Sequence, residues 1–280
     1  MYIDSHAHLF VEEYRADRDD VIHRARSAGV DRIVVPGTTL ETSREAVALA
    51  EQYDLVFAAV GFHPHDAANA SDEGLSEIEE LSAHEKVVAI GEIGLDFHYD
   101  FSPRDVQQQV FEKQIAIAVR RDLPIIVHTR ESILEAMLIV GQVALSTPKW
   151  KKRSASAAGD LVATRGVFHC FSGDTEQCKR LFELGFFVSY PGIVTFKNSP
   201  VIETIKSIGV RNLLIETDSP YMTPVPFRGK RNEPAHVRLV AETISEALEL
   251  SVTEVAVRTS ANATLLFDLP EIRGSNNGGE

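Results

Sequence analysis

Histidines and carboxylates in this chain follow short apolar segments, in positions that suit metal chemistry. His6 and His8 stand two residues apart in the first of these segments. Side chains two apart on a strand point to the same face, so both imidazoles can bind one ion. The H-x-H spacing alone is a weak signal of a metal site, because a solitary histidine is more commonly structural.

Four further donors strengthen the metal hypothesis. Later apolar segments end near Glu92, His128, His169 and Asp218. The six side chains suffice for two divalent cations that keep positions open for water and substrate. Glu92 is the natural bridge, because a carboxylate can bind two ions through its two oxygens. Imidazole with carboxylate suits Zn or Mn, and Mg where water fills the remaining positions. A metal-free cluster of these groups would be costly to bury.

The elements that must position these donors alternate along the chain. Short β-branched or apolar segments predict strands at 2–8, 32–36, 55–61, 87–92, 124–128, 166–170, 186–190 and 213–218. Segments of helical period lie at 20–28, 43–52, 105–121 and 175–184, and two more follow at 233–249 and 252–266. Strands that alternate with helices pair in parallel. Eight such units over roughly 250 residues predict an α/β fold, a (β/α)8 TIM barrel.

A doubly wound open sheet is the competing architecture, and strand periodicity does not exclude it. The sequence contains neither a GxGxxG loop nor a Walker lysine motif, which weakens the nucleotide-binding version of that fold. In the barrel, all six donors lie at or near the carboxyl ends of strands, and so does His63. Barrel enzymes carry their catalytic residues on that face. The sequence therefore predicts one barrel domain over 1–268 with a metal site at its mouth.

Composition and charge exclude several classes of protein. Lys+Arg number 28 and Asp+Glu 41, a net charge of −13, which excludes a generally basic nucleic-acid coat and a polybasic membrane binder. A nucleic-acid enzyme whose positive charge is local or carried by metal stays compatible. No apolar segment approaches the roughly 18 residues of a membrane span, and the N-terminus lacks a signal-peptide pattern. Cys170 and Cys178 form no disulfide framework. We therefore predict a cytoplasmic protein; oligomeric state is left open.

Two segments are interpreted as additions to the barrel. Residues 142–165 contain a basic stretch with Trp150, followed by a small-residue stretch, and are predicted to be a mobile surface insertion. The alternative is a basic lip at which the tryptophan contacts nucleic acid. The tail at 269–280, rich in Gly and Asn from 271, is predicted to be disordered.

The chain resembles the TatD family of metal-dependent deoxyribonucleases, within the amidohydrolase-like metallohydrolase barrels. The matching motifs, in order, are Asp4-Ser5-His6-Ala7-His8, Gly61-Phe62-His63-Pro64-His65, Gly91-Glu92-Ile93-Gly94-Leu95-Asp96, Val127-His128-Thr129-Arg130, His169-Cys170-Phe171-Ser172-Gly173, Glu216-Thr217-Asp218-Ser219-Pro220-Tyr221 and Arg228-Gly229-Lys230-Arg231-Asn232-Glu233-Pro234. The resemblance runs from residue 1 to about 268, apart from the insertion.

The resemblance implies a ligand set and an activity. It implies that His6, His8, Glu92 and Asp218 bind one metal, and that Glu92, His128 and His169 bind the second. It also implies hydrolysis of phosphodiesters, with 3′→5′ trimming of DNA, single-stranded or at its 3′ ends. From the residues alone, two close cations suit an in-line displacement, and Asp218 is placed to accept a proton from the attacking water. Glu92 and Asp218 are thus the predicted catalytic residues.

Three residues are predicted to contact substrate. His63 lies inside the mouth without being needed for either metal, so a hydrogen bond to phosphate is expected. Arg130 shares the face of His128 if the strand continues, where it could bind a phosphate oxygen. Arg228 belongs to a basic loop with Lys230 and Arg231, and solvated surface is an equally good interpretation of that loop.

The remaining polar residues near the mouth are given supporting roles. Asp4 and Glu216 share the faces of neighbouring donors and are interpreted as supporting acids. Cys170 is interpreted as a strand residue and not a nucleophile, since no base is left to activate it.

Two rival functions stay open. The first is a metal-dependent ester or amide hydrolase of the same barrel group, for example one that removes an acyl group from tRNA, because fold does not determine chemistry. Related barrels that cleave neutral esters often bridge their metals with a modified lysine after strand four, whereas this chain has Glu92 there. The second rival is a binding protein that has lost catalysis, which the intact set of six ligands disfavours.

Overall fold

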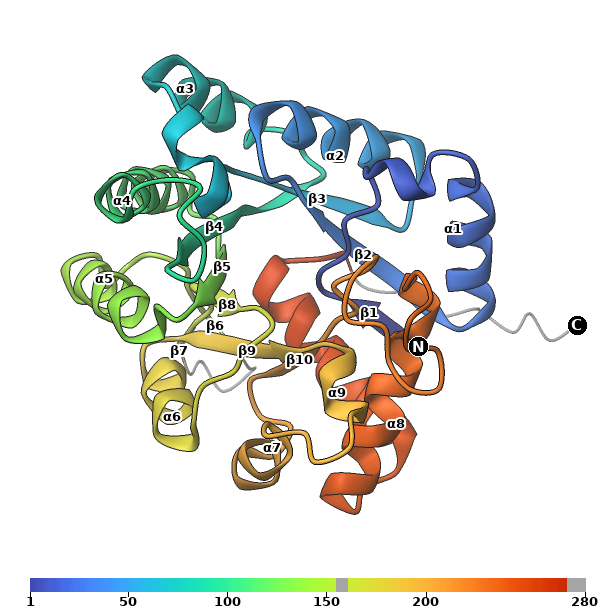
Figure 1. Cartoon of the computed structure of the whole chain (residues 1–280). Coiled ribbons are helices and arrows are strands. Elements are labelled where there is room, and N and C mark those ends of the chain that lie inside the picture. The colour runs from blue at the N-terminus through green and yellow to red at the C-terminus, as the bar shows by residue number, and fades with distance from the viewer. Residues whose placement is uncertain (155–160, 271–280) are drawn as a thin grey trace, which may run out of the picture.

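The described residues form a parallel barrel surrounded by helices. In the computed structural model, residues 1–154 and 161–270 are described. Their main sheet has eight strands in the order β1-β2-β3-β4-β5-β8-β9-β10, and every pair within it is parallel. Figure 1 shows these strands as a ring, with most helices on its outside. The predicted barrel and all eight predicted strand positions are confirmed.

The strands and helices alternate as the sequence pattern indicates. The barrel strands are β1 (Tyr2–Asp4), β2 (Val30–Pro36), β3 (Val56–Val60), β4 (Val87–Asp96), β5 (Ile125–Arg130), β8 (Gly166–Phe168), β9 (Phe186–Tyr190) and β10 (Leu213–Ile215). The α-helices are α1 (Arg18–Ser27), α2 (Leu40–Gln52), α3 (Asp72–Leu81), α4 (Arg104–Arg121), α5 (Ile133–Ser146), α6 (Thr175–Glu183), α7 (Ile202–Ile208), α8 (Val237–Leu248) and α9 (Val252–Phe267). Short 3-10 helices occupy Glu12–Tyr14, Pro64–Asn69, Gly192–Thr195 and Pro234–His236. In the described parts, none of these helices is long and apolar enough to cross a membrane.

Backbone contacts between the ends of the first and last strands close the ring. The Ser5 N–H donates to the carbonyl of Ile215 at 3.1 Å, and the Asp218 N–H donates to that of His6 at 2.9 Å. The buried Asp4 carboxylate adds a side-chain link, because it accepts hydrogen bonds from the N–H and the hydroxyl of Thr217. This closure excludes the open doubly wound sheet.

The barrel interior is a separate apolar core. Each barrel strand contributes at least one buried residue to it: Ile3, Val34, Phe57, Val88, Ile126, Val167, Phe187 and Leu214. Leu266 and Phe267 of α9 belong to the same cluster. The Asn262 side chain of α9 donates to the carbonyl of Leu213, at the start of β10, at 2.9 Å. Helix α9 therefore covers the amino-terminal end of the barrel, and the opposite end is left for a site.

The segment at 142–165 combines the end of a helix with a short hairpin. Its first residues complete α5, and β6 (Lys152–Ser154) pairs antiparallel with β7 (Leu161–Ala163). Trp150 is only 3% exposed, packs edge-on against Phe186, and donates its indole N–H to the carbonyl of Leu123. Because Leu123 precedes β5, this contact lies at the amino-terminal end of the barrel. The idea of a Trp150-bearing lip is therefore wrong. The predicted disorder at 271–280 lies outside the described residues.

Candidate metal centre and active site

A cleft opens at the carboxyl ends of the barrel strands. Its volume is about 520 Å³, and its lining combines metal-binding and aromatic side chains. It is lined by His8, Phe10, Val11, Thr38, His63, His65, Asp66, Glu92, Asp96, Tyr99, His128, Arg130, His169, Asp218 and Tyr221. Five of the six predicted ligands belong to this lining, and the sixth, His6, is fully buried in contact with them.

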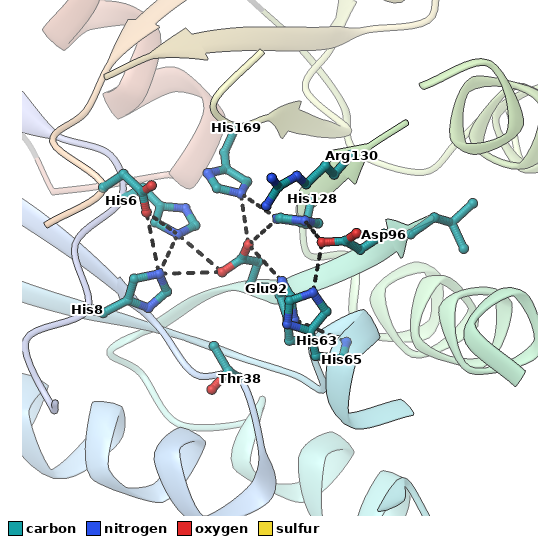
Figure 2. A network of polar contacts seen from close by, with 12 residues as sticks. His6, His8, Thr38, His63, His65, Glu92, Asp96, His128, Arg130 and His169 are labelled. Atoms are coloured by element: carbon teal, nitrogen blue, oxygen red, sulfur yellow. Dashed lines mark hydrogen bonds and ion pairs between the residues drawn. The ribbon is translucent and has the colours of Figure 1, made fainter. Parts of the chain in front are cut away.

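The Glu92 carboxylate lies between two pairs of imidazoles (Figure 2). Its Oε2 is 3.3 Å from Nε2 of His6 and 3.6 Å from Nε2 of His8. Its Oε1 is 2.8 Å from Nε2 of His169 and 2.9 Å from Nδ1 of His128. The two oxygens of one carboxylate thus face separate histidine pairs, the arrangement that a bridging ligand requires.

Asp218 joins the first of these pairs. Its Oδ1 lies 3.6 Å from Nε2 of His8 and 3.9 Å from Nε2 of His6. The backbone of Asp218 is left-handed, with φ of 53°, just after β10. Non-glycine residues adopt this conformation rarely, and it is common at functional positions. The turn brings the carboxylate of the last strand to the histidines of the first.

The histidine pairs and carboxylates converge as a metal site requires. The Nε2 atoms of His6 and His8 are only 3.2 Å apart. Three sets of donor atoms lie within 4.8 Å of one another: His6 with His8 and Glu92, His63 with Glu92 and His128, and His6 with His169 and Asp218. Nitrogen and oxygen donors so close together suit Zn or Mn, and Mg with added water. The residues present therefore fit divalent cations.

The charges of the cluster keep its two carboxylates ionised. Burial raises the pKa of Glu92, but the nearby imidazoles of His169, His63 and His6 outweigh it and hold that pKa well below the usual range. Asp218 behaves likewise: its pKa is lowered, because contacts with the neighbouring histidines outweigh burial. Burial also lowers the pKa of His6, which favours a neutral imidazole. At His8, His128 and His169 the neighbouring carboxylates outweigh burial and raise the pKa, so a cation that binds there must displace protons from these imidazoles.

Two buried acids, Asp96 and Glu216, contact the imidazoles of His128 and His169 on the side away from Glu92. Oδ2 of Asp96 lies 3.3 Å from Nε2 of His128. Oε1 of Glu216 accepts the N–H of Cys170 at 2.7 Å and lies 3.6 Å from Nδ1 of His169. Such outer carboxylates fix the orientation of ligating imidazoles. Glu216 thus has the geometry of a supporting acid. Asp4 supports the site indirectly, because its carboxylate accepts hydrogen bonds from Thr217 and joins β1 to the residues after β10.

Of the three predicted substrate-binding residues, His63 and Arg130 line the cleft and Arg228 does not. His63 lies in the cluster itself, with Nε2 3.5 Å from Oε1 of Glu92. β5 continues to Arg130, so this arginine shares the face of His128 and lines the cleft. Arg228 is absent from the cleft lining, and its guanidinium stacks on Phe196 at 4.0 Å. Arg231, from the same loop, binds Asp17 through two hydrogen bonds.

Sequence reasoning assigned no role to His65, Asp96 or Tyr99, which all line the cleft. The signal was present in the motif Gly91–Asp96. β4 runs to Asp96, beyond its predicted end at 92, so Glu92 and Asp96 stand four residues apart on one strand face.

Cys170 lies beside His169 without the properties of a nucleophile. Burial, with the nearby carboxylates of Asp218 and Glu216, raises the pKa of its thiol well above the usual range. A thiol that stays protonated is a poor nucleophile. Both cysteines of the chain are free.

Comparisons with known proteins agree with this geometry. The family model described as "TatD related DNase" matches residues 3–268. The "Uncharacterized metal-dependent hydrolase YabD" of Bacillus subtilis is 46% identical over 95% of this chain and 99% of its own length. The "3'-5' ssDNA/RNA exonuclease TatD" of Shigella flexneri is 32% identical over 95% of this chain and 98% of its own length.

A solved structure shows the same fold over nearly the whole chain. The crystal structure of YJJV, a TatD homologue from Escherichia coli K12, is 31% identical and superposes with a TM-score of 0.85. The match covers 96% of this chain and 98% of that one. Matches of this extent, together with the histidine and carboxylate cluster at the barrel mouth, assign the chain to the TatD family of metal-dependent hydrolases.

Proposed function

We propose that this protein is a two-cation phosphodiesterase that removes nucleotides from the 3′ end of single-stranded DNA. One observation carries the proposal: the two oxygens of Glu92 face different pairs of histidines at the floor of an open cleft. A carboxylate placed in this way can hold two cations at the short separation that phosphodiester cleavage uses.

The ligands divide between two positions that share Glu92. His6, His8, Asp218 and Glu92 would hold the first cation, and His128 and His169, again with Glu92, would hold the second. When bound, Mg, Mn or Zn ions supply positive charge that stabilises the attacking and leaving oxygens.

Protein groups around this centre handle the proton and the phosphate. The Asp218 carboxylate borders the cleft and accepts a proton from the attacking water. The His63 imidazole, 3.5 Å from Glu92, donates a hydrogen bond to a phosphate oxygen. The Arg130 guanidinium, on the cleft lining, binds the phosphate of the neighbouring nucleotide. Arg228 lies outside the lining, so we place it against a more distant phosphate.

The net charge of −13 limits the kind of DNA binding that this protein can use. Long-range repulsion disfavours wrapping of a long duplex. A strand end that enters the cleft meets local cations and Arg130 instead, so the local field is favourable. The name of the Shigella relative, a 3′-5′ ssDNA/RNA exonuclease, supports this direction of trimming.

The proposal is tested with metal-stripped protein and 5′-labelled single-stranded DNA, after separate additions of Mg, Mn and Zn. We expect a ladder that shortens from the 3′ end, with metal analysis giving two ions per chain. Glu92→Gln should lose both metal and cleavage. Glu85→Gln, an exposed acid just before β4, is the matched control and should retain both.

Two outcomes would contradict the proposal. One metal per chain in a fully active protein would exclude the shared-carboxylate arrangement. An absence of cleavage by protein that holds two metals would exclude DNA as substrate. Aryl esters and aminoacyl-tRNA, assayed in parallel, would then identify the ester or amide hydrolase instead.

A further inference from the structure

Two exposed aromatic side chains lie in the loop that follows β4. Tyr99 is 40% exposed and Phe101 is 65% exposed. Their ring centroids are 5.2 Å apart, at an interplanar angle of 34°. The His65 ring packs edge-on against both, at 5.5 Å from Tyr99 and 4.8 Å from Phe101. We name this pair of rings, Tyr99 and Phe101, the aromatic ledge.

The ledge adjoins the metal centre. Tyr99 lines the same cleft as Glu92 and Arg130. The Arg130 guanidinium lies over the Tyr99 ring, 4.7 Å from its centroid. His65 connects the ledge to the cluster, because its Nε2 lies 2.8 Å from Oδ2 of Asp96, the oxygen that also contacts His128. Figure 2 shows these contacts, which join His65 to Asp96, Asp96 to His128, and His128 to Glu92.

Hydrogen bonds hold the loop that carries the ledge. Oδ1 of Asp96 accepts the N–H of Tyr99 at 3.2 Å and that of His98 at 2.9 Å. The hydroxyl of Ser102 donates to the carbonyl of His65 at 2.8 Å. The aromatic faces are therefore presented by an anchored backbone, and little ordering is required when a ligand binds.

We propose that the aromatic ledge is a base-stacking platform for the nucleotides next to the scissile phosphate. This proposal rests on the proposed function and identifies residues that select its substrate. Every nucleobase has a flat π-face, and stacking on protein aromatics is tolerant of sequence. Arg130 beside the ledge supplies the positive charge that the intervening phosphate needs.

The ledge also selects unpaired ends. Within a duplex both faces of each internal base are covered by neighbours, so a protein ring can stack on such a base only after it has left the helix. A strand end reaches the ledge without that cost. The combination of stacking rings, one arginine and a metal centre thus fits a single-stranded end of any sequence.

The test combines protein variants with oligonucleotides that lack single bases. Binding of metal-loaded protein to 3′-phosphorothioate single-stranded DNA is followed by fluorescence anisotropy, and cleavage of the normal oligonucleotide is measured separately. Tyr99→Ala and Phe101→Ala should each weaken binding about 5- to 150-fold, the range for loss of one stacked base. Tyr53→Ala removes a part-buried tyrosine near the amino-terminal end of the barrel and should leave the Kd unchanged.

An abasic residue placed at successive positions from the 3′ end distinguishes stacking from a structural effect. At the position that meets the ledge, the abasic residue should weaken wild-type binding by a similar factor and weaken the variants no further. If the abasic residue and the ledge substitutions weaken binding independently at every position, so that their factors multiply, the proposal is overturned. An unchanged Kd in the ledge variants would overturn it as well.

The failure of one proposal is distinct from the failure of the other. Ledge-dependent, position-specific binding without cleavage would overturn the phosphodiesterase proposal and retain the platform. Cleavage of DNA by a protein whose Kd does not change in the ledge variants would retain the phosphodiesterase proposal and overturn the platform. Wild-type protein that neither binds nor cleaves the oligonucleotide would overturn both.

Discussion

Asp96 contacts His128 on the side away from Glu92. Its Oδ2 lies 3.3 Å from Nε2 of His128, while Nδ1 of the same ring lies 2.9 Å from Oε1 of Glu92. The imidazole is thereby held between a shared acid and an orienting acid. Asp96 is itself fixed, because its backbone N–H donates to the side-chain oxygen of Gln107 at 2.8 Å. Residues of β4 and α4 thus fix the orientation of the His128 imidazole.

Asp96→Asn should therefore weaken the metal position at His128. Loss of an outer carboxylate commonly costs about 10- to 100-fold in metal affinity or activity. The measurement is competition with a metal-sensitive dye, compared between the variant and wild type. Asp100→Asn, which changes an exposed acid of the same loop, is the control. An unchanged affinity in Asp96→Asn would mean that the His128 ring needs no support.

Much of this site follows from the sequence, because strands and their ends leave local signals. The H-x-H spacing of His6 and His8 predicted converging imidazoles, and their Nε2 atoms are 3.2 Å apart. The alternation of strands and helices predicted the barrel, which places the carboxyl ends of all strands at one mouth. For these features, local pattern and overall topology agree.

Other features depend on contacts that no local pattern reveals. The role of Asp96 requires β4 to continue through a glycine-rich motif, and pairing with β5 supplies the reason that it does. The burial of Trp150 depends on Leu123 and Phe186, which are distant in sequence. A basic and polar neighbourhood made this tryptophan look exposed, although the indole itself packs into the core.

Gly94→Ala is expected to distort the path of the His128 backbone. A Cβ at this position would lie 2.1 Å from the carbonyl oxygen of His128, and the residue has φ of +144°. The β4 and β5 strands must then separate, at a cost of about 1–3 kcal/mol. Chemical denaturation and metal content measure the two effects.

Gly141→Ala is the matched control for that substitution. Gly141 lies within α5, and its nearest neighbour, Cδ1 of Leu184, is at an ordinary 3.6 Å. Alanine in a helix is favoured over glycine by about 1 kcal/mol, so this variant should be as stable as wild type or more so. Equal behaviour of the two variants would remove the argument for close approach at Gly94.

Trp150→Ala should destabilise the whole barrel. The indole is 3% exposed and belongs to the larger apolar core. Truncation of a buried aromatic costs about 3–5 kcal/mol, and the hydrogen bond to Leu123 is lost as well. Leu145→Ala, at a side chain that is 78% exposed on α5, should change the free energy of unfolding by less than about 0.5 kcal/mol. A Trp150→Ala protein with wild-type stability would show that this indole does not stabilise the barrel.

The ion pair between Asp17 and Arg231 should make stability depend on pH. Hydrogen bonds from Arg231, at 2.8 and 2.7 Å, hold the pKa of Asp17 below its ordinary value. A carboxylate whose pKa is lower in the folded state stabilises the fold above its unfolded pKa of about 3.9. That stabilisation is lost as the pH falls through the lower, folded value. Because both side chains are partly exposed, its size is at most about 1 kcal/mol.

Asp17→Asn should thus be less stable than wild type at pH 7, and the difference should shrink toward zero as the pH falls below about 4. Urea unfolding of metal-free protein at a series of pH values measures it without a contribution from metal release. Asp100→Asn supplies the baseline for the loss of an exposed acid. The pair also ties the residues after β10 to the chain before α1, since Asp17 immediately precedes that helix. A difference that persists unchanged at low pH would show that Asp17 does not act through its charge.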